Sequence, residues 1–217
     1  ITGGCGALGL HAARWLADRG VAHIVLMNRS SPESPEVTEA LAELRLQGAT
    51  VQVAIGDVTD RAVVAQALTA IPEGTPLRGV VHAAGVTDDG FLASQTRTRL
   101  DRVLAPKVDG AWNLHALTAD LDLDFFVMYS SAASVLGSAG QSSYAAANGF
   151  LDGLARMRRA NGQPAVSIQW GPWAGGGMES RLDDAIRARL LRWGMTVLTP
   201  EQALLHLDEA LAEGATE

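Results

Sequence analysis

Five short apolar runs alternate along the chain with stretches in which apolar residues recur every three or four positions. Each run reads as a buried strand, and together they cover residues 23–28, 50–56, 77–85, 124–131 and 165–170. The amphipathic stretches predict helices over residues 7–19, 36–47, 60–70, 96–119, 144–160 and 199–214. Alternating strands and helices imply right-handed crossovers and a parallel sheet covered on both faces. We therefore predict a doubly wound α/β fold.

The helix over 199–214 has the most clearly marked start. Thr199 can cap it, Pro200 suits its first position, and Gln202 completes a capping box. A last strand is expected after this helix, beyond the end of the sequence. The first residues, "ITGG", read as the tail of a strand whose beginning is cut off. We therefore expect a piece of a longer polypeptide.

Composition narrows the class of protein. The 217 residues are 47% hydrophobic and 19% charged, which suits one globular domain with a large core. The formal charge of −7 and the lack of a basic block argue against a nucleic-acid surface. The single cysteine, Cys5, excludes an internal disulfide and a cysteine metal cluster, and it fits a reducing cytoplasm. No apolar run approaches the ~20 residues of a membrane span.

A glycine pattern opens the chain. In "ITGGCGALGL", Gly4, Gly6 and Gly9 are spaced as G-x-G-x-x-G between a strand end and a helix start. Glycines at these positions allow a tight turn and let backbone N–H groups approach a pyrophosphate at the helix N-terminus. The same pattern also occurs in plain turns. Its place between a strand and a helix favours dinucleotide binding.

The residues after the next strand bear on the choice of dinucleotide. An NAD site would have an acidic residue here to bind the ribose 2′-OH, but the chain reads Asn28, Arg29, Ser30. Arg29 can pair with a 2′-phosphate, or it can be a solvated side chain. The absence of an acid favours NADP. Asp57 either accepts a hydrogen bond from adenine or caps the following turn, and we expect His82 to be structural.

A second group of polar residues gathers near the fourth and fifth strands. Tyr144 and Asn148 lie four residues apart on a predicted helix, so they share one face. Ser131 ends the preceding strand, at the sheet edge where this helix begins. Reduction of a ketone by hydride needs a proton for the emerging alkoxide, and a phenol can supply it. A cation would lower the phenol's pKa, and Lys107 is a candidate, although most lysines are solvated.

These residues resemble a family. "GGCGALG" matches the GGxGxxG loop of the complex short-chain dehydrogenases/reductases, and Tyr144 and Asn148 form YxxxN where other members carry YxxxK. Together with "VVHAAG", "LAPKVDGAWNLHALT" and "QWGPWAGGGM", they resemble the ketoreductase domain of a modular type I polyketide synthase, over essentially the whole chain. The resemblance implies a Rossmann fold in which residues 1–217 form the catalytic, NADPH-binding subdomain. A second, cofactor-free structural half would precede them.

The resemblance also implies an activity, partners and site residues. Such domains use NADPH to reduce a β-ketoacyl thioester, which the phosphopantetheine arm of an acyl carrier protein presents beside neighbouring synthase domains. They serve polyketide pathways that include antibiotic biosynthesis. Tyr144 would be the general acid, Ser131 a donor to the ketone oxygen, Lys107 the charge that tunes Tyr144, and Asn148 the holder of a proton relay. The cofactor would contact Thr2, Gly3, Gly4, Gly6, Leu8, Gly9, Asn28, Arg29, Ser30, Asp57, Val58, Ala83, Ala84 and Gly85.

The stereochemical outcome can also be predicted from the resemblance. B-type domains carry Leu-Asp-Asp after the fourth strand, counting the truncated first one, and give a D-hydroxyl. In this chain Thr87, Asp88 and Asp89 follow the corresponding strand over 77–85. A-type domains carry a tryptophan eight residues before the tyrosine, where this chain has Leu136. Position 147 is alanine rather than the proline of many epimerising domains. We predict B1-type reduction, without epimerisation, although "TDDG" alone reads as a turn.

The glycine-rich stretch at 171–180 is predicted to be a mobile loop over the carboxyl edge of the sheet. Trp173 within it either packs in the core or borders the substrate entrance. The substrate and stereocontrol residues are expected to be Asp88, Asp89, Leu136, Gln141, Pro172, Trp173 and Met178.

Two other functions fit parts of the pattern. A catalytically silent ketoreductase-like domain would keep the fold and support a megasynthase, but such domains typically lose the tyrosine or the asparagine. Sugar-nucleotide epimerases share the glycine loop but use YxxxK, and position 148 is asparagine.

Overall fold

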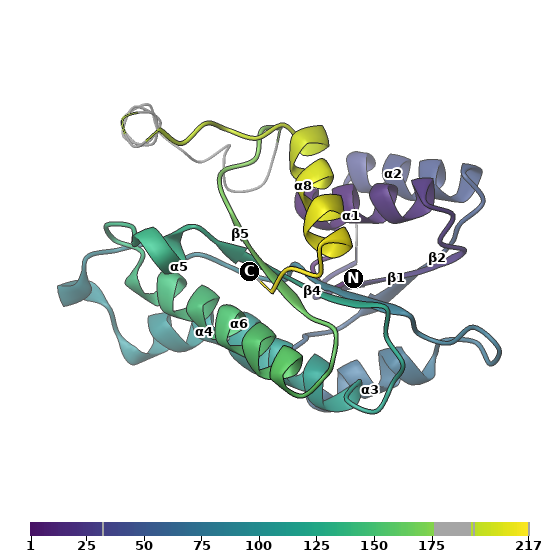
Figure 1. The fold of residues 1–217 in the computed structure, drawn as a ribbon, viewed down its shortest axis with the longest axis horizontal. Coiled ribbons are helices and arrows are strands. Elements are labelled where there is room, and N and C mark those ends of the chain that lie inside the picture. The colour runs from purple at the N-terminus through teal and green to yellow at the C-terminus, as the bar shows by residue number, and fades with distance from the viewer. Residues whose placement is uncertain (32, 176–191, 193, 217) are drawn as a thin grey trace.

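A computed structural model describes residues 1–31, 33–175, 192 and 194–216. Its parallel sheet carries helices on both faces (Figure 1). The strands are β1 (His23–Asn28), β2 (Thr50–Ile55), β3 (Gly79–His82), β4 (Phe125–Ser131) and β5 (Val166–Trp170). The helices are α1 (Ala7–Asp18), α2 (Pro35–Leu46), α3 (Arg61–Thr69), α4 (Arg97–Leu117), α5 (Ala133–Leu136), α6 (Ser142–Ala160) and α8 (Pro200–Ala212), with a 3₁₀ turn at Leu92–Ser94. The doubly wound prediction is confirmed.

Thr2 joins the two halves of the sheet. It forms parallel bridges to Met27 of β1 and to His82 of β3, so the order runs β2–β1–Thr2–β3–β4–β5. The first residues thus occupy the strand position that the sequence predicts for them. At the other edge, the Ser167 N–H donates to the carbonyl of Thr216 at 2.9 Å, so the chain returns beside β5 after α8.

Each face of the sheet has its own core. Helices α1, α2 and α8 cover one face, where Leu26, Leu44 and Leu207 are fully buried. Helices α3, α4 and α6 cover the other face, where Phe126 and Leu151 are fully buried. The continuous apolar strands follow from this burial on both faces.

The start of α8 follows the predicted signals. Thr199 and Gln202 form the predicted capping box at α8, with reciprocal contacts of 3.3 and 3.0 Å. At the starts of α2, α3 and α4, the side chains of Ser34, Asp60 and Thr96 accept backbone N–H groups of the first helical turn. The third strand is shorter than predicted, because the chain leaves the sheet after His82 and runs as loop. That loop carries several of the expected site residues.

Candidate active site

The glycine loop is folded tightly against the sheet. Gly3 has a φ of +65°, and its carbonyl accepts the Gly6 N–H at 3.0 Å. A Cβ atom on Gly9 would lie 2.3 Å from the Gly3 carbonyl oxygen, and one on Gly3 would lie 2.9 Å from the backbone nitrogen of Ala84. These close backbone approaches show why glycine occupies both positions.

Helix α1 begins directly after this loop with an open N-terminus. Gly6 is its N-cap and supplies no side-chain cap, and the first turn contains no acidic residue. Such an end attracts anions through its free N–H groups and helix dipole. Together with the glycine cradle, it fits the pyrophosphate of a dinucleotide. The residues that could hold this group are Thr2, Gly3, Gly4, Gly6, Leu8 and Gly9.

The predicted 2′-phosphate residues lie at the carboxyl end of β1. Arg29 and Ser30 are exposed, and Arg29 forms no ion pair with the residues that the structure describes. The Asn28 side chain donates to the Ser30 carbonyl at 2.9 Å and so orders the turn that carries Arg29. The guanidinium is thus available to an anion beside the glycine loop.

The loop after β2 shows one of the two roles predicted for Asp57. The Asp57 carboxylate accepts the Thr59 N–H at 2.9 Å, so Asp57 does cap its turn. Val58 is buried, and its carbonyl accepts from the Asn113 side chain of α4 at 3.1 Å. Asn113 also donates to the Thr59 carbonyl at 2.9 Å, which fixes this loop to the helix.

The loop after β3 brings Ala83, Ala84 and Gly85 between the glycine loop and α4. A Cβ atom on Gly85 would lie 2.9 Å from Cε of Lys107 and 3.3 Å from its Nζ. His82 is fully buried, with Nδ1 2.7 Å from the Thr2 hydroxyl. Burial and then the Lys107 charge lower the His82 pKa to about 3, so the ring is neutral, as a structural histidine would be.

Three of the four predicted catalytic residues meet where β4 ends and α6 begins. Tyr144 is buried, which raises the pKa of its phenol, and hydrogen bonding with the Asn148 and Ser131 side chains acts in the opposite direction. Asn148 is fully buried and donates to the Tyr144 carbonyl at 2.8 Å. Its Oδ1 has no partner within hydrogen-bonding distance among the described residues, so it can accept a proton donor.

Lys107 approaches this group from the neighbouring helix. It is 3% exposed, its Nζ donates to the Tyr129 carbonyl at 2.7 Å, and the same nitrogen lies 5.8 Å from the centre of the Tyr144 ring. Burial lowers the Lys107 pKa from 10.5 to about 8, against the attraction of Asp152. The structure thus brings the four predicted catalytic residues together, and we call them the tetrad.

The pKa of Tyr144 differs from the prediction. Lys107 was expected to lower it, but burial raises it and outweighs the opposing effects of Asn148 and Ser131. The ammonium is directed to the Tyr129 carbonyl rather than to the phenol oxygen. The phenol is therefore held protonated, which suits a proton donor.

Arg99 of α4 anchors the predicted stereocontrol loop. Its Nε and Nη2 donate to one Asp88 carboxylate oxygen at 2.9 and 2.5 Å. Its guanidinium also reaches the carbonyls of Asp89 at 2.7 Å and Ser94 at 3.2 Å. This pairing lowers the Asp88 pKa, so Asp88 stays ionised and serves to shape the loop.

The same loop is tied to the start of α6. The Gln141 side chain donates to the Asp89 carboxylate at 2.9 Å, and the Gly90 N–H donates to the Gly140 carbonyl at 2.8 Å. The predicted residues Asp89 and Gln141 are therefore hydrogen-bonded to each other, and Gln141 lies three residues before Tyr144. Leu136 ends α5 with 62% of its surface exposed.

The segment after β5 is placed only in part. Trp173 is buried and packs edge-on against Trp170 with ring centres 4.9 Å apart, so the core-packing alternative is the one that the geometry supports. The Pro172 carbonyl accepts from Leu198 at 2.9 Å, which joins this segment to the start of α8. Met178 and the rest of the glycine-rich stretch from 176 lie outside the described residues.

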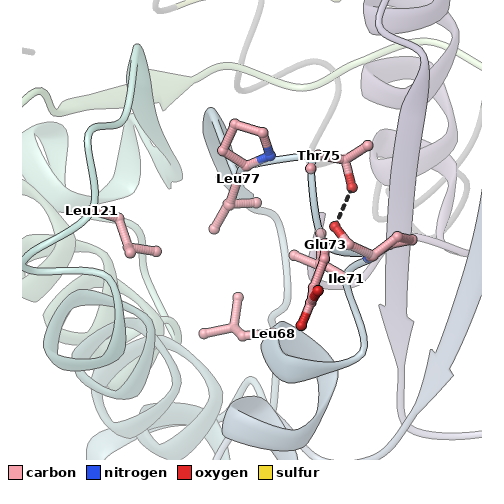
Figure 2. A pocket seen from close by; sticks show the side chains of 9 residues that line it. Leu68, Ile71, Glu73, Thr75, Leu77 and Leu121 are labelled. Carbon is pink, nitrogen blue, oxygen red and sulfur yellow. Dashed lines mark hydrogen bonds between the residues drawn. The ribbon is translucent and has the colours of Figure 1, made fainter.

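An apolar hollow lies at the end of the sheet where the strands begin, away from the four predicted catalytic residues. The hollow has a volume of about 460 Å³ and lies between the end of α3 and the start of β3. Figure 2 shows Leu68, Ile71, Leu77 and Leu121 around it. The Thr75 hydroxyl donates to the Pro72 carbonyl at 2.6 Å in its rim. The hollow is remote from the tetrad and holds none of the predicted site residues.

Sequence reasoning missed three residues that shape the site. Arg99 and Asn113 hold loops through contacts between distant segments, which no local pattern reveals. Asp152 is a buried carboxylate on α6, one turn beyond Asn148. Its spacing of four and eight residues from Asn148 and Tyr144 was a signal that could have found it.

The fold and the site define a short-chain dehydrogenase/reductase-type protein, with a dinucleotide cradle on one side of a serine–tyrosine–lysine–asparagine group. Comparison with protein-family models gives the family: residues 1–175 match the KR domain. The chain belongs to this ketoreductase family, whose fold binds nicotinamide dinucleotides. None of the helices among the described residues is long and apolar enough to cross a membrane.

Similar proteins are parts of large synthases. The spectinabilin polyketide synthase system protein NorB of Streptomyces orinoci is 50% identical over 215 residues, which are 98% of this chain and 10% of that protein. A Mycobacterium tuberculosis relative, described as a suspected inactive phenolphthiocerol synthesis polyketide synthase, is 46% identical over 98% of this chain and 13% of its own length. A solved A-type ketoreductase from a modular polyketide synthase superposes with a TM-score of 0.94 at 45% identity, covering all of this chain and 45% of that one.

Proposed function

We propose that this chain reduces a β-ketoacyl thioester to a D-β-hydroxyacyl thioester with NADPH, in polyketide biosynthesis. The observation that carries the proposal is the convergence of Ser131, Tyr144, Lys107 and Asn148 beside the glycine cradle. Residues 1–217 are the catalytic, NADPH-binding subdomain in this proposal.

The reaction adds a hydride to the ketone carbon and a proton to its oxygen. NADPH, when bound, supplies the hydride. The Ser131 hydroxyl donates a hydrogen bond to the ketone oxygen, and the protonated phenol of Tyr144 transfers its proton there. Lys107 stabilises the phenolate that remains, and Asn148 Oδ1 holds the donor through which Tyr144 regains a proton. Positioned acids and oxyanion donors contribute factors of about 10² to 10⁴ and 10² to 10³.

The preference for NADPH rests on Arg29. A guanidinium pairs with a phosphate in forked geometry, and Arg29 lies exposed at the end of β1 without an ion-pair partner among the described residues. No acidic residue occupies the neighbouring positions 28 and 30. Both features favour a 2′-phosphate over a 2′-hydroxyl.

The D configuration rests on the loop that carries Asp88 and Asp89, and the B1 behaviour rests on the alanine at position 147. Arg99 holds the loop, and Gln141 ties Asp89 to the helix of the general acid. The substrate therefore meets a wall of fixed shape before it reaches Tyr144, and that wall selects the ketone face. Leu136 stands at the position of the A-type tryptophan.

The substrate's carrier is the phosphopantetheine arm of an acyl carrier protein. Neighbouring synthase domains and the structural half of the ketoreductase are the further partners, in the cytoplasm. The support is that the relatives which match this chain are large polyketide synthases, of which it spans only a small part.

Tyr144→Phe tests the proposal against a matched variant. The parent chain should oxidise NADPH with a diketide β-ketothioester, and Tyr144→Phe should lower turnover by a factor of about 10² to 10⁴ while NADPH binding stays unchanged. Tyr129→Phe is the control, because Tyr129 is also buried and its hydroxyl has no partner among the described residues. Equal rates for parent and Tyr144→Phe would refute the acid assignment, and an inactive parent would favour the silent domain. Chiral chromatography of the product should give the D-hydroxy isomer, with the configuration of the α-carbon unchanged.

A further inference from the structure

Asn113 holds the loop after β2 with both protons of its side-chain amide. It lies on α4 and is 8% exposed, and its Nδ2 donates to the Val58 carbonyl at 3.1 Å and to the Thr59 carbonyl at 2.9 Å. Carbonyl oxygens only accept hydrogen bonds, so a side-chain atom that contacts two of them must carry two protons. The amide nitrogen meets this requirement, whereas a carboxylate or an apolar side chain does not.

The loop also packs directly on the backbone of α4, one turn before Asn113. Val58 is 5% exposed, and a Cβ atom on Gly110 would lie 2.7 Å from its Cγ1. A side chain at position 110 would therefore push the loop away from the helix. Gly110 and Asn113 are three residues apart, so they face the loop from one side of α4. The close contact and the two hydrogen bonds together fix the position of the loop.

This loop lies beside the parts of the chain that are proposed to bind the phosphate groups. The Gly56 N–H donates to the Asn28 carbonyl at 2.9 Å, so the loop begins next to Arg29. In the sheet, β1 separates β2 from Thr2, where the glycine loop starts. A dinucleotide with its pyrophosphate in the glycine cradle and its 2′-phosphate at Arg29 carries adenine on that same ribose. Its adenine ring would therefore lie against residues 57–59.

Asp57 supplies a polar group at this loop. It is exposed, and its Oδ1 accepts the Thr59 N–H at 2.9 Å. A carboxylate has two oxygens, so Oδ2 can accept from the amino group of adenine. Val58 and Thr59 follow Asp57 directly, so the place of this carboxylate depends on the contacts that Asn113 makes.

We propose that Asn113 is a positioning residue that sets the affinity for the adenine half of the dinucleotide. It acts through the backbone of Val58 and Thr59. By holding the loop in place before the cofactor binds, it removes the cost of ordering that loop on binding. The inference rests on the proposed function, because it takes NADPH as the cofactor.

Separate binding of the two halves of NADPH tests this role. Asn113→Leu removes both donors and keeps a side chain of similar size. Isothermal titration calorimetry of the full chain with adenosine 2′,5′-bisphosphate, the adenine half, should give a Kd about tenfold above that of the parent, roughly 1.4 kcal/mol. The Kd for reduced nicotinamide mononucleotide, the other half, should stay unchanged. An unchanged Kd for the bisphosphate, or an equal rise for both halves, would overturn the proposal.

Thr118→Val is the matched control on the same helix. Thr118 is fully buried, and its hydroxyl donates to the Leu114 carbonyl at 2.7 Å rather than to the loop. The control should lower the free energy of unfolding and leave both Kd values unchanged. Asn113→Ala carries the same expectation as Asn113→Leu if the leucine variant folds poorly by circular dichroism. If Thr118→Val raised the Kd for the bisphosphate as much as the variants at position 113, stability alone would set the affinity and the proposal would fail.

Hydrogen exchange tests the loop without any ligand. The Thr59 N–H, which donates to the Asp57 carboxylate, should exchange faster in Asn113→Leu than in the parent and in Thr118→Val. Equal exchange rates in all three chains would contradict the restraint on the loop and overturn the proposal.

Kinetics separate this role from general packing. With a diketide β-ketothioester, Asn113→Leu should raise the KM for NADPH and leave kcat at saturating NADPH near that of the parent. A lower kcat with an unchanged KM would reduce Asn113 to a packing role and overturn the inference. A parent that binds the bisphosphate without turnover would count against the proposed function, while the Kd comparison would still decide the role of Asn113. A parent that does not bind the bisphosphate would overturn both.

Discussion

Burial of the Lys107 charge should make the folded chain less stable at neutral pH than it would be without that charge. The pKa of Lys107 falls from 10.5 to about 8 on folding, because burial disfavours the ammonium. That gap corresponds to about 3 kcal/mol of destabilisation wherever both states carry the proton, which is below pH 8. Lys107→Met removes the charge and keeps an unbranched side chain of similar length.

The pH dependence has a definite direction. Between pH 8 and 10.5 the unfolded chain binds the Lys107 proton and the folded chain releases it, so the free energy of unfolding rises with pH in this window. Between pH 7 and 9.5 the parent should gain about 2 kcal/mol relative to Lys107→Met. The lost hydrogen bond to the Tyr129 carbonyl adds an offset that does not depend on pH.

Urea denaturation followed by tryptophan fluorescence measures this difference, since the chain has five tryptophans. Other titrating groups, such as Cys5, whose pKa burial raises, are present in both chains and cancel in the subtraction. A difference between parent and variant that stays flat from pH 7 to 9.5 would show that the lysine is not held as a desolvated cation. The basis for its catalytic assignment would then be lost.

Three further changes test other parts of the site. Gly9→Ala should weaken NADPH binding at least about tenfold, roughly 1.4 kcal/mol, because its Cβ would lie 2.3 Å from the Gly3 carbonyl oxygen. Gly153→Ala on α6 is the control: its Cβ would meet nothing within 4 Å, so the free energy of unfolding should stay unchanged or rise by up to about 1 kcal/mol. Arg29→Ala should raise the Kd for NADPH far more than that for NADH, and equal losses in a fluorescence titration would remove the 2′-phosphate contact. Arg99→Lys keeps the charge but loses the fork onto Asp88, so the ratio of D to L product should fall, whereas Arg97→Lys on the same helix should leave it unchanged by chiral chromatography.

The elements were predictable because this sheet is buried on both faces. Each strand is a continuous apolar run and each covering helix a clear amphipathic one, so the observed bounds lie within a few residues of those predicted. The exceptions are elements without a period to detect. Helix α5 has four residues and the 3₁₀ turn at Leu92–Ser94 has three, and β3 ends at His82 because its apolar continuation leaves the sheet.

The site was predictable only where its residues form local patterns. Tyr144 and Asn148 lie one turn apart on a helix, and the glycines lie within one loop. Arg99 acts through Asp88, eleven residues away, and Asn113 acts through Val58, fifty-five residues away. The pKa of Tyr144 depends on burial, which the packing of α4, β4 and α6 decides, and so its direction was wrongly predicted.

Because the lysine lies on α4, the distance between Lys107 and Tyr144 depends on how α4 packs against α6. In a YxxxK arrangement the phenol and the ammonium share one helix, and local geometry sets their separation. Here Lys107 reaches Tyr144 across the contact between α4 and α6, in a space kept open by Gly85, whose Cβ would lie 2.9 Å from the lysine. Because the lysine lies on α4, position 148 of α6 can be an asparagine. Asp152, one turn further along α6, then has no lysine beside it on the same helix face. Changes in the core between these helices should therefore alter the proton affinity of Lys107 as well as stability.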